Sequence, residues 1–417
     1  MTQAQIAGRG EAGRIHSAPL AELPALDFDD RYFRAPQAAI APLVAAGARA
    51  ARIPQMGTAM LLRHADVHAA LLDPRLGAMG VRYYEQQGWS SGPYIEWVRR
   101  TLVFLDPPDH DRLRTLLGRA FTPRQVARVR PIAQQLAAQL ASAAAERERV
   151  DLYDAFAQRL PLQVICGMLA IPSVDYAQVH DWTTALSLAT AYPTPEMRVA
   201  ADRATSEMND YVLRLIGERR AQPGDDLLSA LIAAEEAGDR LAPDELVAMV
   251  VQLVYAGHET TRNLIGNGLY CLLSHPAELA RLRAEPALLP SAVEEMLRYE
   301  PPIIFLSRTA LEDVELFGLE FARGDLMHLS IASANRDADA FPEPERFDVS
   351  REDNRHLSFG FGAHFCIGAA IARMEARVAF EELLTRFPRI ELTGAPRWAS
   401  ATALRTLESF PVRLASA

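Results

Sequence analysis

The stretch that decides the fold reads Phe359-Gly360-Phe361-Gly362-Ala363-His364-Phe365-Cys366-Ile367-Gly368. Its glycines indicate a loop that needs unusual backbone angles or the close approach of another group. Small residues follow Cys366, and an amphipathic stretch then runs to Arg386, which predicts a helix that begins at the cysteine. Because free backbone N–H groups and the helix dipole favour an anion, the pKa of this thiol is expected to be lowered. A thiolate, a glycine-rich loop and a helix face made of small side chains together predict a binding site for a large, flat group.

The longest expected helix lies upstream of this loop. It should begin near Pro243 and run to about Ser274, before Pro276, which gives a length of ~45 Å at 1.5 Å per residue. Its first half is apolar on nearly all sides, so it should be buried. Its centre reads Ala256-Gly257-His258-Glu259-Thr260-Thr261, although Gly, Thr and a charged Glu are unfavourable inside a buried helix. Such a local conflict indicates a functional site.

Helical periodicity dominates the rest of the chain, and strand-like segments are few and short. Further helices are expected over 122–148 and 201–220, where apolar residues recur on one face. Short strands are expected at Met60–Leu62, Val314–Phe317, Leu326–Ile331 and Ser409–Leu414. The pattern predicts a mainly α fold with small peripheral β-sheets, in a single domain over residues 1–417 whose first residues, roughly 1–25, form a loose lead-in.

Composition excludes several classes of protein. The formal net charge is -10 and no Lys/Arg-rich run is present, which argues against a nucleic-acid partner. The longest apolar stretch, Leu246–Gly257, is shorter than the ~18 residues that suggest a membrane span, and the N-terminus has no apolar run of signal-peptide length. Cys166, Cys271 and Cys366 show no paired spacing, so neither a disulfide scaffold nor a structural zinc site is expected. We therefore expect a soluble, cytoplasmic protein without a membrane or nucleic-acid partner.

The stretch around Cys366 resembles the haem-binding signature F-G-x-G-x-H-x-C-x-G of soluble, bacterial-type cytochromes P450. All specified positions are matched, by Phe359, Gly360, Gly362, His364, Cys366 and Gly368. The alternative, a buried cysteine on a helix, suits Cys166 and Cys271, which stand among apolar helical residues. The resemblance implies a haem b, held between the long central helix and the helix after the cysteine, with the Cys366 thiolate as the ligand of the iron.

Other motifs of the family occur in its order along the chain. Ala256–Thr261 resembles the oxygen-activation motif on the family's longest helix, and Glu295 with Arg298 resembles its E-x-x-R motif. Pro344–Phe347 resembles the segment whose arginine, here Arg346, completes a structural ion cluster with that pair. The resemblance implies that Glu295, Arg298 and Arg346 serve folding and haem retention.

Asp106–Arg114 is similar to the family's helix that binds the haem propionates, and Arg308 stands where a further propionate ligand usually falls. The implied propionate ligands are His110, Arg114, Arg308 and His364. For His110 the alternative is a surface histidine between acidic residues. The cofactor is implied to contact further residues of both segments, namely Phe359, Gly360 and Gly368 in the cysteine loop and Ala256 and Gly257 on the long helix.

The resemblance implies that Thr260 and Glu259 are the catalytic residues. Gly257 would loosen the helix beside the iron, Thr260 would hydrogen-bond the oxygen, and Glu259 would pass protons inward. The alternative for Thr260 is a hydrogen bond from its hydroxyl to a preceding carbonyl, which is common for a mid-helix threonine. His258 is expected to be structural.

The implied reaction inserts one oxygen atom of O2 into an organic substrate, with electrons from NAD(P)H. The sequence has neither a G-x-G-x-x-G nucleotide motif nor a ferredoxin cysteine set, so electrons should arrive from a separate ferredoxin and its reductase. Arg112, Arg119 and Arg373 could present a basic surface to an acidic partner, or could simply be a solvated face.

Two other readings stay open at this point. A peroxygenase or a nitric-oxide-reductase-like member would keep the haem and change the chemistry, and a haem carrier or sensor would not catalyse a reaction. The pair Glu259 and Thr260 favours O2 activation over both.

Apolar and aromatic residues recur where the family contacts its substrate, which predicts a mainly hydrophobic small molecule. The candidate contact residues are Tyr94, Gln252, Tyr255, Ile303, Ile304, Phe305 and Thr402. At 3.6 residues per turn, Gln252 and Tyr255 should border the space above the haem, where either could hydrogen-bond a polar group of the substrate. A neighbouring side chain or water that satisfies Gln252 is the alternative.

Overall fold

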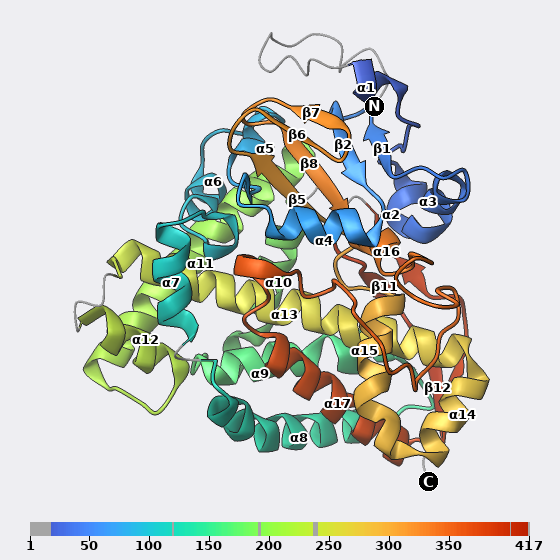
Figure 1. Ribbon diagram of the computed structural model, residues 1–417. Helices are drawn as coiled ribbons and strands as arrows, with labels where there is room; N and C mark the ends of the chain where they lie inside the picture. Colours follow the sequence, from blue (N-terminus) through green and yellow to red (C-terminus); the bar gives the residue numbers. More distant parts are fainter. Residues whose placement is uncertain (1–17, 119–120, 191–192, 237–240, 401, 416–417) are drawn as a thin grey trace.

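The computed structural model describes residues 18–118, 121–190, 193–236, 241–400 and 402–415 (Figure 1). Arg119 of the predicted basic surface and the first part of the predicted lead-in, residues 1–17, lie outside the described residues. Within the described part, no helix is both long and apolar enough to cross a membrane.

Helices make up most of the described chain. The α-helices are α1 Ala18–Glu22, α2 Asp30–Arg34, α3 Pro36–Ala45, α4 His64–Leu72, α5 Arg82–Glu85, α6 Pro93–Val98, α7 Asp109–Gly118, α8 Pro123–Ala145, α9 Arg159–Met168, α10 Tyr176–Leu188, α11 Pro195–Ala221, α12 Leu227–Glu236, α13 Pro243–Ser274, α14 Pro276–Ala284, α15 Leu289–Tyr299, α16 Ile331–Ala334 and α17 Ala369–Arg386. Short 3₁₀ or π turns are η2 Leu102–Phe104, η3 Tyr153–Ala157, η4 Ser173–Asp175, η5 Pro286–Leu288 and η6 Gly362–His364.

The predicted long helix is α13, and its bounds are those expected from the sequence. Pro243 occupies its first turn, where no backbone N–H is needed, and Glu245 accepts a hydrogen bond from the N–H of Ala242 at 2.9 Å. Most of the 32 residues of α13 are buried. Helices α9, α10, α11, α15 and α17 pack against it, so α13 forms the centre of the molecule (Figure 1).

The largest sheet has five strands in the order β1-β2-β8-β5-β3. These strands are β1 Ala50–Ile53, β2 Thr58–Leu61, β8 Leu326–Ser330, β5 Phe305–Ala310 and β3 Leu76–Ala78. β2 and β8 are parallel and the other pairs are antiparallel, with Arg308 of β5 opposite both Ala78 and Met327. This register fixes the position of Arg308 relative to the rest of the sheet.

Smaller sheets lie outside the helical core. They are formed by β4 Arg149–Asp151, β12 Pro411–Ala415 and β9 Arg389–Leu392, by β6 Val314–Leu316 and β7 Leu319–Phe321, and by β10 Arg397–Trp398 and β11 Leu407–Ser409. The predicted strands at 60–62, 314–317 and 326–331 are confirmed to within about two residues. The predicted strand at 409–414 is divided between β11 and β12. The predicted class, mainly α with small peripheral sheets, is confirmed.

Helix α17, which follows the cysteine loop, packs against α13 and along α8. Figure 1 shows α17 crossing beside α13, and the segment that leads into α17 contacts α4 and α7. The helix that begins after the cysteine loop is therefore packed on the long helix α13.

Candidate active site

The cysteine loop has the unusual backbone that its glycines predict. Gly360 and Gly362 have φ values of +67° and +70°, in the left-handed region that favours glycine. A Cβ on Gly362 would lie 3.0 Å from the carbonyl oxygen of Leu71 on α4, so a side chain there would meet backbone. The N–H of Cys366 donates to the carbonyl of Phe359 at 2.9 Å, which closes the loop directly before α17.

The predicted lowering of the Cys366 pKa is wrong for the protein chain by itself. Burial raises the pKa of the thiol, and the backbone N–H groups of Gly368 and Ala369, with the charges of Arg114 and Arg373, offset this only in part. Desolvation therefore outweighs the start of the helix. A metal cation at the sulfur would reverse this balance, because metal coordination deprotonates a thiol outright.

Next to this loop, α7, β5 and η6 bring together groups that attract an anion. The rings of His110 and His364 lie 4.2 Å apart between centroids. His110 is only 1% exposed, so the alternative that it is a surface histidine is wrong. Its Nδ1 lies 3.0 Å from Asp111, whereas its buried Nε2 has no hydrogen-bond partner among the described residues.

Arg308 adds a buried cation to the same place. Its guanidinium donates to the carbonyl of Ser307 at 3.1 Å, and no carboxylate of the described residues forms an ion pair with it. Burial lowers the pKa of Arg308 to about 10. Burial also lowers the pKa of His364 to about 3, with help from the charges of Arg308, His110 and Arg114. A buried arginine and an unsatisfied histidine nitrogen side by side indicate a site for a negatively charged group.

The middle of α13 carries a partly open strip although the rest of the helix is buried. Ala256 is exposed, and Gly257 and Thr260 are partly exposed. The helix is uninterrupted here, and the hydroxyl of Thr260 donates to the carbonyl of Ala256 at 2.8 Å, which is the alternative considered for this residue. A Cβ on Gly257 would lie 3.1 Å from Cγ1 of Ile165, so this glycine permits the close packing of α9 and does not open the helix.

Glu259 does not face this strip. It is fully buried, and its Oε2 accepts a hydrogen bond from Arg262 at 2.5 Å. Its Oε1 lies 3.3 Å from Nδ1 of His258. Burial raises the pKa of Glu259, and Arg262 with the hydroxyls of Ser187 and Thr183 opposes this rise. The carboxylate is thus held toward α10, away from the open strip.

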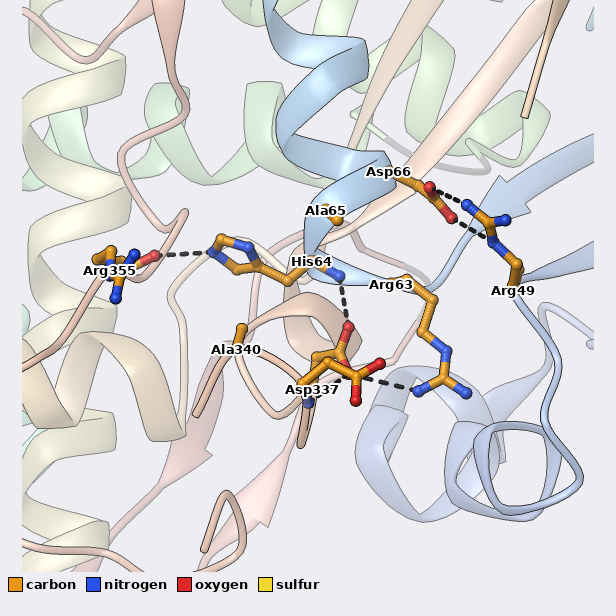
Figure 2. Close-up of a pocket in the computed structure, with 9 residues that line it drawn as sticks. Arg49, Arg63, His64, Ala65, Asp66, Asp337, Ala340 and Arg355 are labelled. Carbon is orange, nitrogen blue, oxygen red and sulfur yellow. Dashed lines mark hydrogen bonds and ion pairs between the residues drawn. The ribbon is translucent and has the colours of Figure 1, made fainter. Parts of the chain in front are cut away.

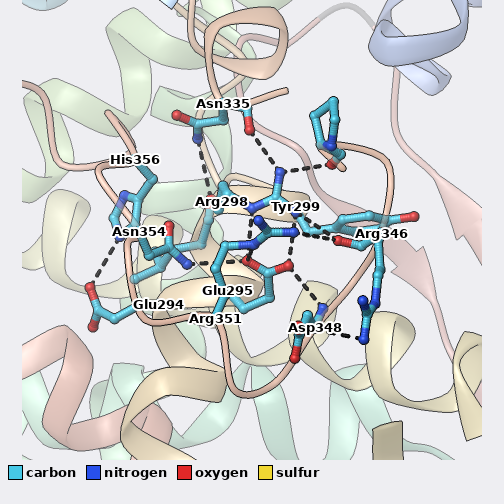
Figure 3. Close-up of polar contacts among 12 residues, drawn as sticks. Glu294, Glu295, Arg298, Tyr299, Asn335, Arg346, Asp348, Arg351, Asn354 and His356 are labelled. Carbon is cyan, nitrogen blue, oxygen red and sulfur yellow. Dashed lines mark hydrogen bonds and ion pairs between the residues drawn. The ribbon is translucent and has the colours of Figure 1, made fainter. Parts of the chain in front are cut away.

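The predicted ion cluster exists, but a different arginine completes it. Arg298 makes two hydrogen bonds to the carboxylate of Glu295, at 2.7 and 2.8 Å, and both side chains are fully buried (Figure 3). The second arginine on Glu295 is Arg351, whose Nε lies 3.1 Å from Oε2. The prediction for Arg346 is wrong: its side chain is 51% exposed and pairs with Glu343, while only its backbone carbonyl accepts from Arg298. No sequence signal distinguished Arg351 from other arginines of this segment.

Most of the residues predicted to contact the substrate are buried against other residues of the protein. Ile304 and Phe305 are 0% and 4% exposed and pack in a hydrophobic cluster, so nearly all of their surface is covered by other residues of the chain. The hydroxyl of Tyr94 is buried and hydrogen-bonded to that of Tyr84 at 3.0 Å. Thr402 is buried, and its hydroxyl accepts from the N–H of Leu404 at 3.2 Å.

Gln252, Tyr255 and Ile303 keep part of their surface. Gln252 already has a partner, because its Oε1 accepts from the N–H of Leu102 at 2.9 Å. This bond ties α13 to η2. The side-chain oxygen of Gln252 is thus satisfied by a partner within the protein, which was the alternative to a substrate contact.

The predicted basic surface is largely neutralised. Arg112 pairs with Glu245 at 2.5 Å and Asp109 at 2.9 Å, and Arg373 pairs with Glu294 at 2.7 Å. The guanidinium carbon of Arg373 also lies 4.4 Å from the centre of the Phe359 ring.

A separate pocket of about 490 Å³ lies at the start of α4 and shares no residue with this site (Figure 2). Its charged walls are paired with one another. Arg49 bonds to Asp66 at 2.5 Å, and Asp337 accepts from Arg63 at 3.3 Å and from the N–H of His64 at 2.8 Å.

The predicted site residues fit the group that the sequence implied. A haem needs an iron ligand, flat surfaces and partners for its propionates. Cys366 offers a thiol beside a helix start, Ala256 offers an open, small surface, and the histidine and arginine side chains of the anion site suit carboxylates.

Comparison with known proteins agrees with this geometry. The family model for cytochrome P450 matches residues 91–394. The chain is 40% identical to cytochrome P450 monooxygenase PikC of Streptomyces venezuelae, over 97% of each protein. It is 38% identical to mycinamicin IV hydroxylase/epoxidase of Micromonospora griseorubida, over 85% of this chain and 88% of that protein. Among solved structures, the myxobacterial cytochrome P450 CYP267B1 in complex with myristic acid superposes with a TM-score of 0.86 at 38% identity, over 94% of this chain and 99% of that one. The chain therefore belongs to the cytochrome P450 family.

Proposed function

We propose that this protein is a haem-thiolate monooxygenase that inserts one oxygen atom of O2 into a mainly hydrophobic small molecule, by hydroxylation or epoxidation. The observation that carries the proposal is the anion site beside the Cys366 loop. The buried Nε2 of His110 has no hydrogen-bond partner among the described residues, and burial outweighs the charge of Asp106 at the buried cation of Arg308, so both groups favour a negatively charged ligand.

In this proposal Cys366 is the protein ligand of the haem iron. His110, Arg114, Arg308 and His364 bind the propionates. Arg114 is partly exposed, and no carboxylate of the described residues forms an ion pair with it. When bound, the haem supplies the iron at which O2 is activated, and its thiolate ligand favours cleavage of the O–O bond.

Thr260 and Glu259 of α13 would transfer protons during the reaction. The Thr260 hydroxyl lies on the open strip and can exchange its bond to Ala256 for one to a bound water or oxygen. Glu259 is a buried carboxyl, and burial raises its pKa above the ordinary value, which favours its protonated form. Because it faces α10, its side chain must move or act through water to reach Thr260.

The substrate class follows from the relatives and from the lining of the open strip. One relative is named mycinamicin IV hydroxylase/epoxidase, and a related structure is a complex with myristic acid. In this chain Tyr255 and Ile303 are partly exposed apolar side chains that suit such a molecule. Electrons are proposed to come from NAD(P)H through a separate ferredoxin and its reductase.

Absorption spectroscopy tests the cofactor assignment. The reduced protein with carbon monoxide should show the absorption band characteristic of cytochromes P450, and Cys366→Ser should abolish this band. Cys166→Ser and Cys271→Ser are matched controls that should keep it, since both thiols are buried in the helical core. If Cys366→Ser kept the band and either control lost it, the assignment would be wrong.

Turnover tests the reaction. Thr260→Ala should still consume NAD(P)H but release peroxide in place of product, because proton transfer to oxygen is impaired. Full coupling in this variant would contradict the role of Thr260. A peroxygenase would turn over on peroxide without a reductase, and a carrier or sensor would not consume NAD(P)H with any candidate compound.

A further inference from the structure

A buried polar cluster lies where α13 packs against α10, on the side of α13 that faces away from the open strip. We define it as His180 and Thr183 of α10 with His258, Glu259 and Arg262 of α13. The Thr183 hydroxyl lies 2.9 Å from Nδ1 of His258, which in turn lies 3.3 Å from Oε1 of Glu259. Arg262 bonds to the other carboxylate oxygen at 2.5 Å. The cluster thus forms a continuous polar contact from α10 to Glu259.

Several atoms of this cluster are buried without a hydrogen-bond partner in the described part of the chain. They are Nδ1 of His180, Nε2 of His258 and Nε of Arg262. A buried polar atom without a partner costs about 1–3 kcal/mol, and native proteins satisfy nearly all of them with protein groups or water. Three such atoms in one cluster therefore indicate bound water. The rings of His180 and His258 are 5.4 Å apart between centroids, close enough for one water molecule to bond to both.

The cluster reaches the surface at His180. This residue is partly exposed, and its Nε2 lies 3.2 Å from Nε2 of Gln158, which is also partly exposed. Burial lowers the pKa of His180, with Arg262 and Arg159 acting in the same direction and Asp181 and Asp154 opposing them. Burial, Arg262 and His180 lower the pKa of His258 far below its usual value. Both rings are therefore neutral at pH 7, so each has one N–H and one free nitrogen.

We propose that His180, Thr183 and His258 form the route by which protons from solvent reload Glu259. This inference rests on the proposed role of Glu259 as a proton donor. Arg262, one turn further along α13, positions the carboxyl against this route.

The transfer leaves no net charge on the route. A proton enters at the free nitrogen of His180 while the proton of its other nitrogen leaves toward water. Water passes a proton to the free Nε2 of His258, and His258 gives the proton of Nδ1 to the Thr183 hydroxyl, which passes its own proton to Glu259. Return of each ring to its starting tautomer resets the route. Glu259 is then protonated and ready for the next transfer toward Thr260.

Matched variants of Thr183 test the route in the haem-loaded enzyme. Thr183→Val keeps the shape and removes the hydroxyl, whereas Thr183→Ser keeps the hydroxyl. The measured quantity is the rate of NAD(P)H oxidation by O2 in H2O and in D2O, with saturating surrogate ferredoxin and reductase. Thr183→Val and His258→Gln should be slower by about tenfold, with a larger solvent isotope effect. Thr183→Ser should stay close to the unmodified enzyme.

Glu259→Gln separates failure of the route from failure of the donor. If Glu259→Gln is slow but Thr183→Val and His258→Gln match the unmodified enzyme, protons reach Glu259 by another path and the route is wrong. If Glu259→Gln oxidises NAD(P)H as fast as the unmodified enzyme, Glu259 is not the proton donor and the proposed route is wrong as well. Equal slowing in Thr183→Val and Thr183→Ser would indicate a packing effect and would also overturn the proposal.

A high-resolution crystal structure gives a test that does not depend on turnover. It should show ordered water bonded to Nε2 of His258 and to Nδ1 of His180 or Oε1 of Glu259. A dry cluster, with these atoms bonded to protein groups, would refute the route.

Discussion

Replacing Arg351 by Met should destabilise the protein, whereas the same replacement of Arg346 should have little effect. The two arginines belong to the same segment, and the sequence pattern favours Arg346. The structure favours Arg351, because its side chain is 10% exposed and bonds to the fully buried carboxylate of Glu295 at 3.1 Å. Its guanidinium also donates to the backbone carbonyls of Pro342 and Glu343, at 2.8 and 3.2 Å.

The magnitude follows from the bonds that each variant loses. A hydrogen bond to a charged group contributes about 1.5–3 kcal/mol, and Glu295 keeps Arg298, so we expect Arg351→Met to lower the free energy of unfolding by about 2–3 kcal/mol. Arg346 loses only exposed pairs, to Glu343 at 3.3 Å and Asp348 at 3.7 Å, which contribute below about 1 kcal/mol. With an unfolding entropy of about 2.1 cal/mol/K per residue over 417 residues, the Arg351 variant should melt about 2–4 °C lower.

The assay is scanning calorimetry of both haem-loaded variants at the same scan rate, since a large protein can unfold irreversibly. A melting temperature of Arg351→Met equal to that of the unmodified protein would refute the reasoning. So would a larger loss in Arg346→Met.

Two further predictions concern pH and the link between α13 and η2. Burial raises the pKa of Glu294, but hydrogen bonds from His356 and Arg373 outweigh this effect and bring the pKa to about 2. The ionised carboxylate therefore stabilises the folded protein fully above about pH 5, and this contribution is lost as the pH falls toward 2. In urea titrations, the free energies of unfolding of the unmodified protein and of Glu294→Gln should converge over this range. A constant difference down to pH 2 would contradict this. Gln252→Leu leaves the N–H of Leu102 without its acceptor and should reduce the free energy of unfolding by about 1–3 kcal/mol, whereas Gln252→Glu keeps an acceptor and should lose less; equal losses would show that the bond is unimportant.

Local features of the chain could be read from the sequence because they depend on neighbouring residues. Pro243 starts α13 since proline needs no N–H partner in the first helical turn, and the helix ends at Ser274, two residues before Pro276. Gly360 and Gly362 adopt the positive φ values that a cysteine loop of this kind requires. The motif around Cys366 thereby indicated the family before any long-range contact was known.

Partner choice between distant segments was decided only by the tertiary structure. Whether Arg346 or Arg351 reaches Glu295 depends on how the loop between α16 and η6 folds over α15, and the spacing of the arginines carries no information about this. Similarly, helical periodicity places Glu259 on α13 but does not show that Arg262 and α10 hold its carboxylate away from Ala256. Secondary structure follows short-range preferences, whereas the direction and burial of a polar side chain depend on desolvation and on partners that packing brings from elsewhere in the chain.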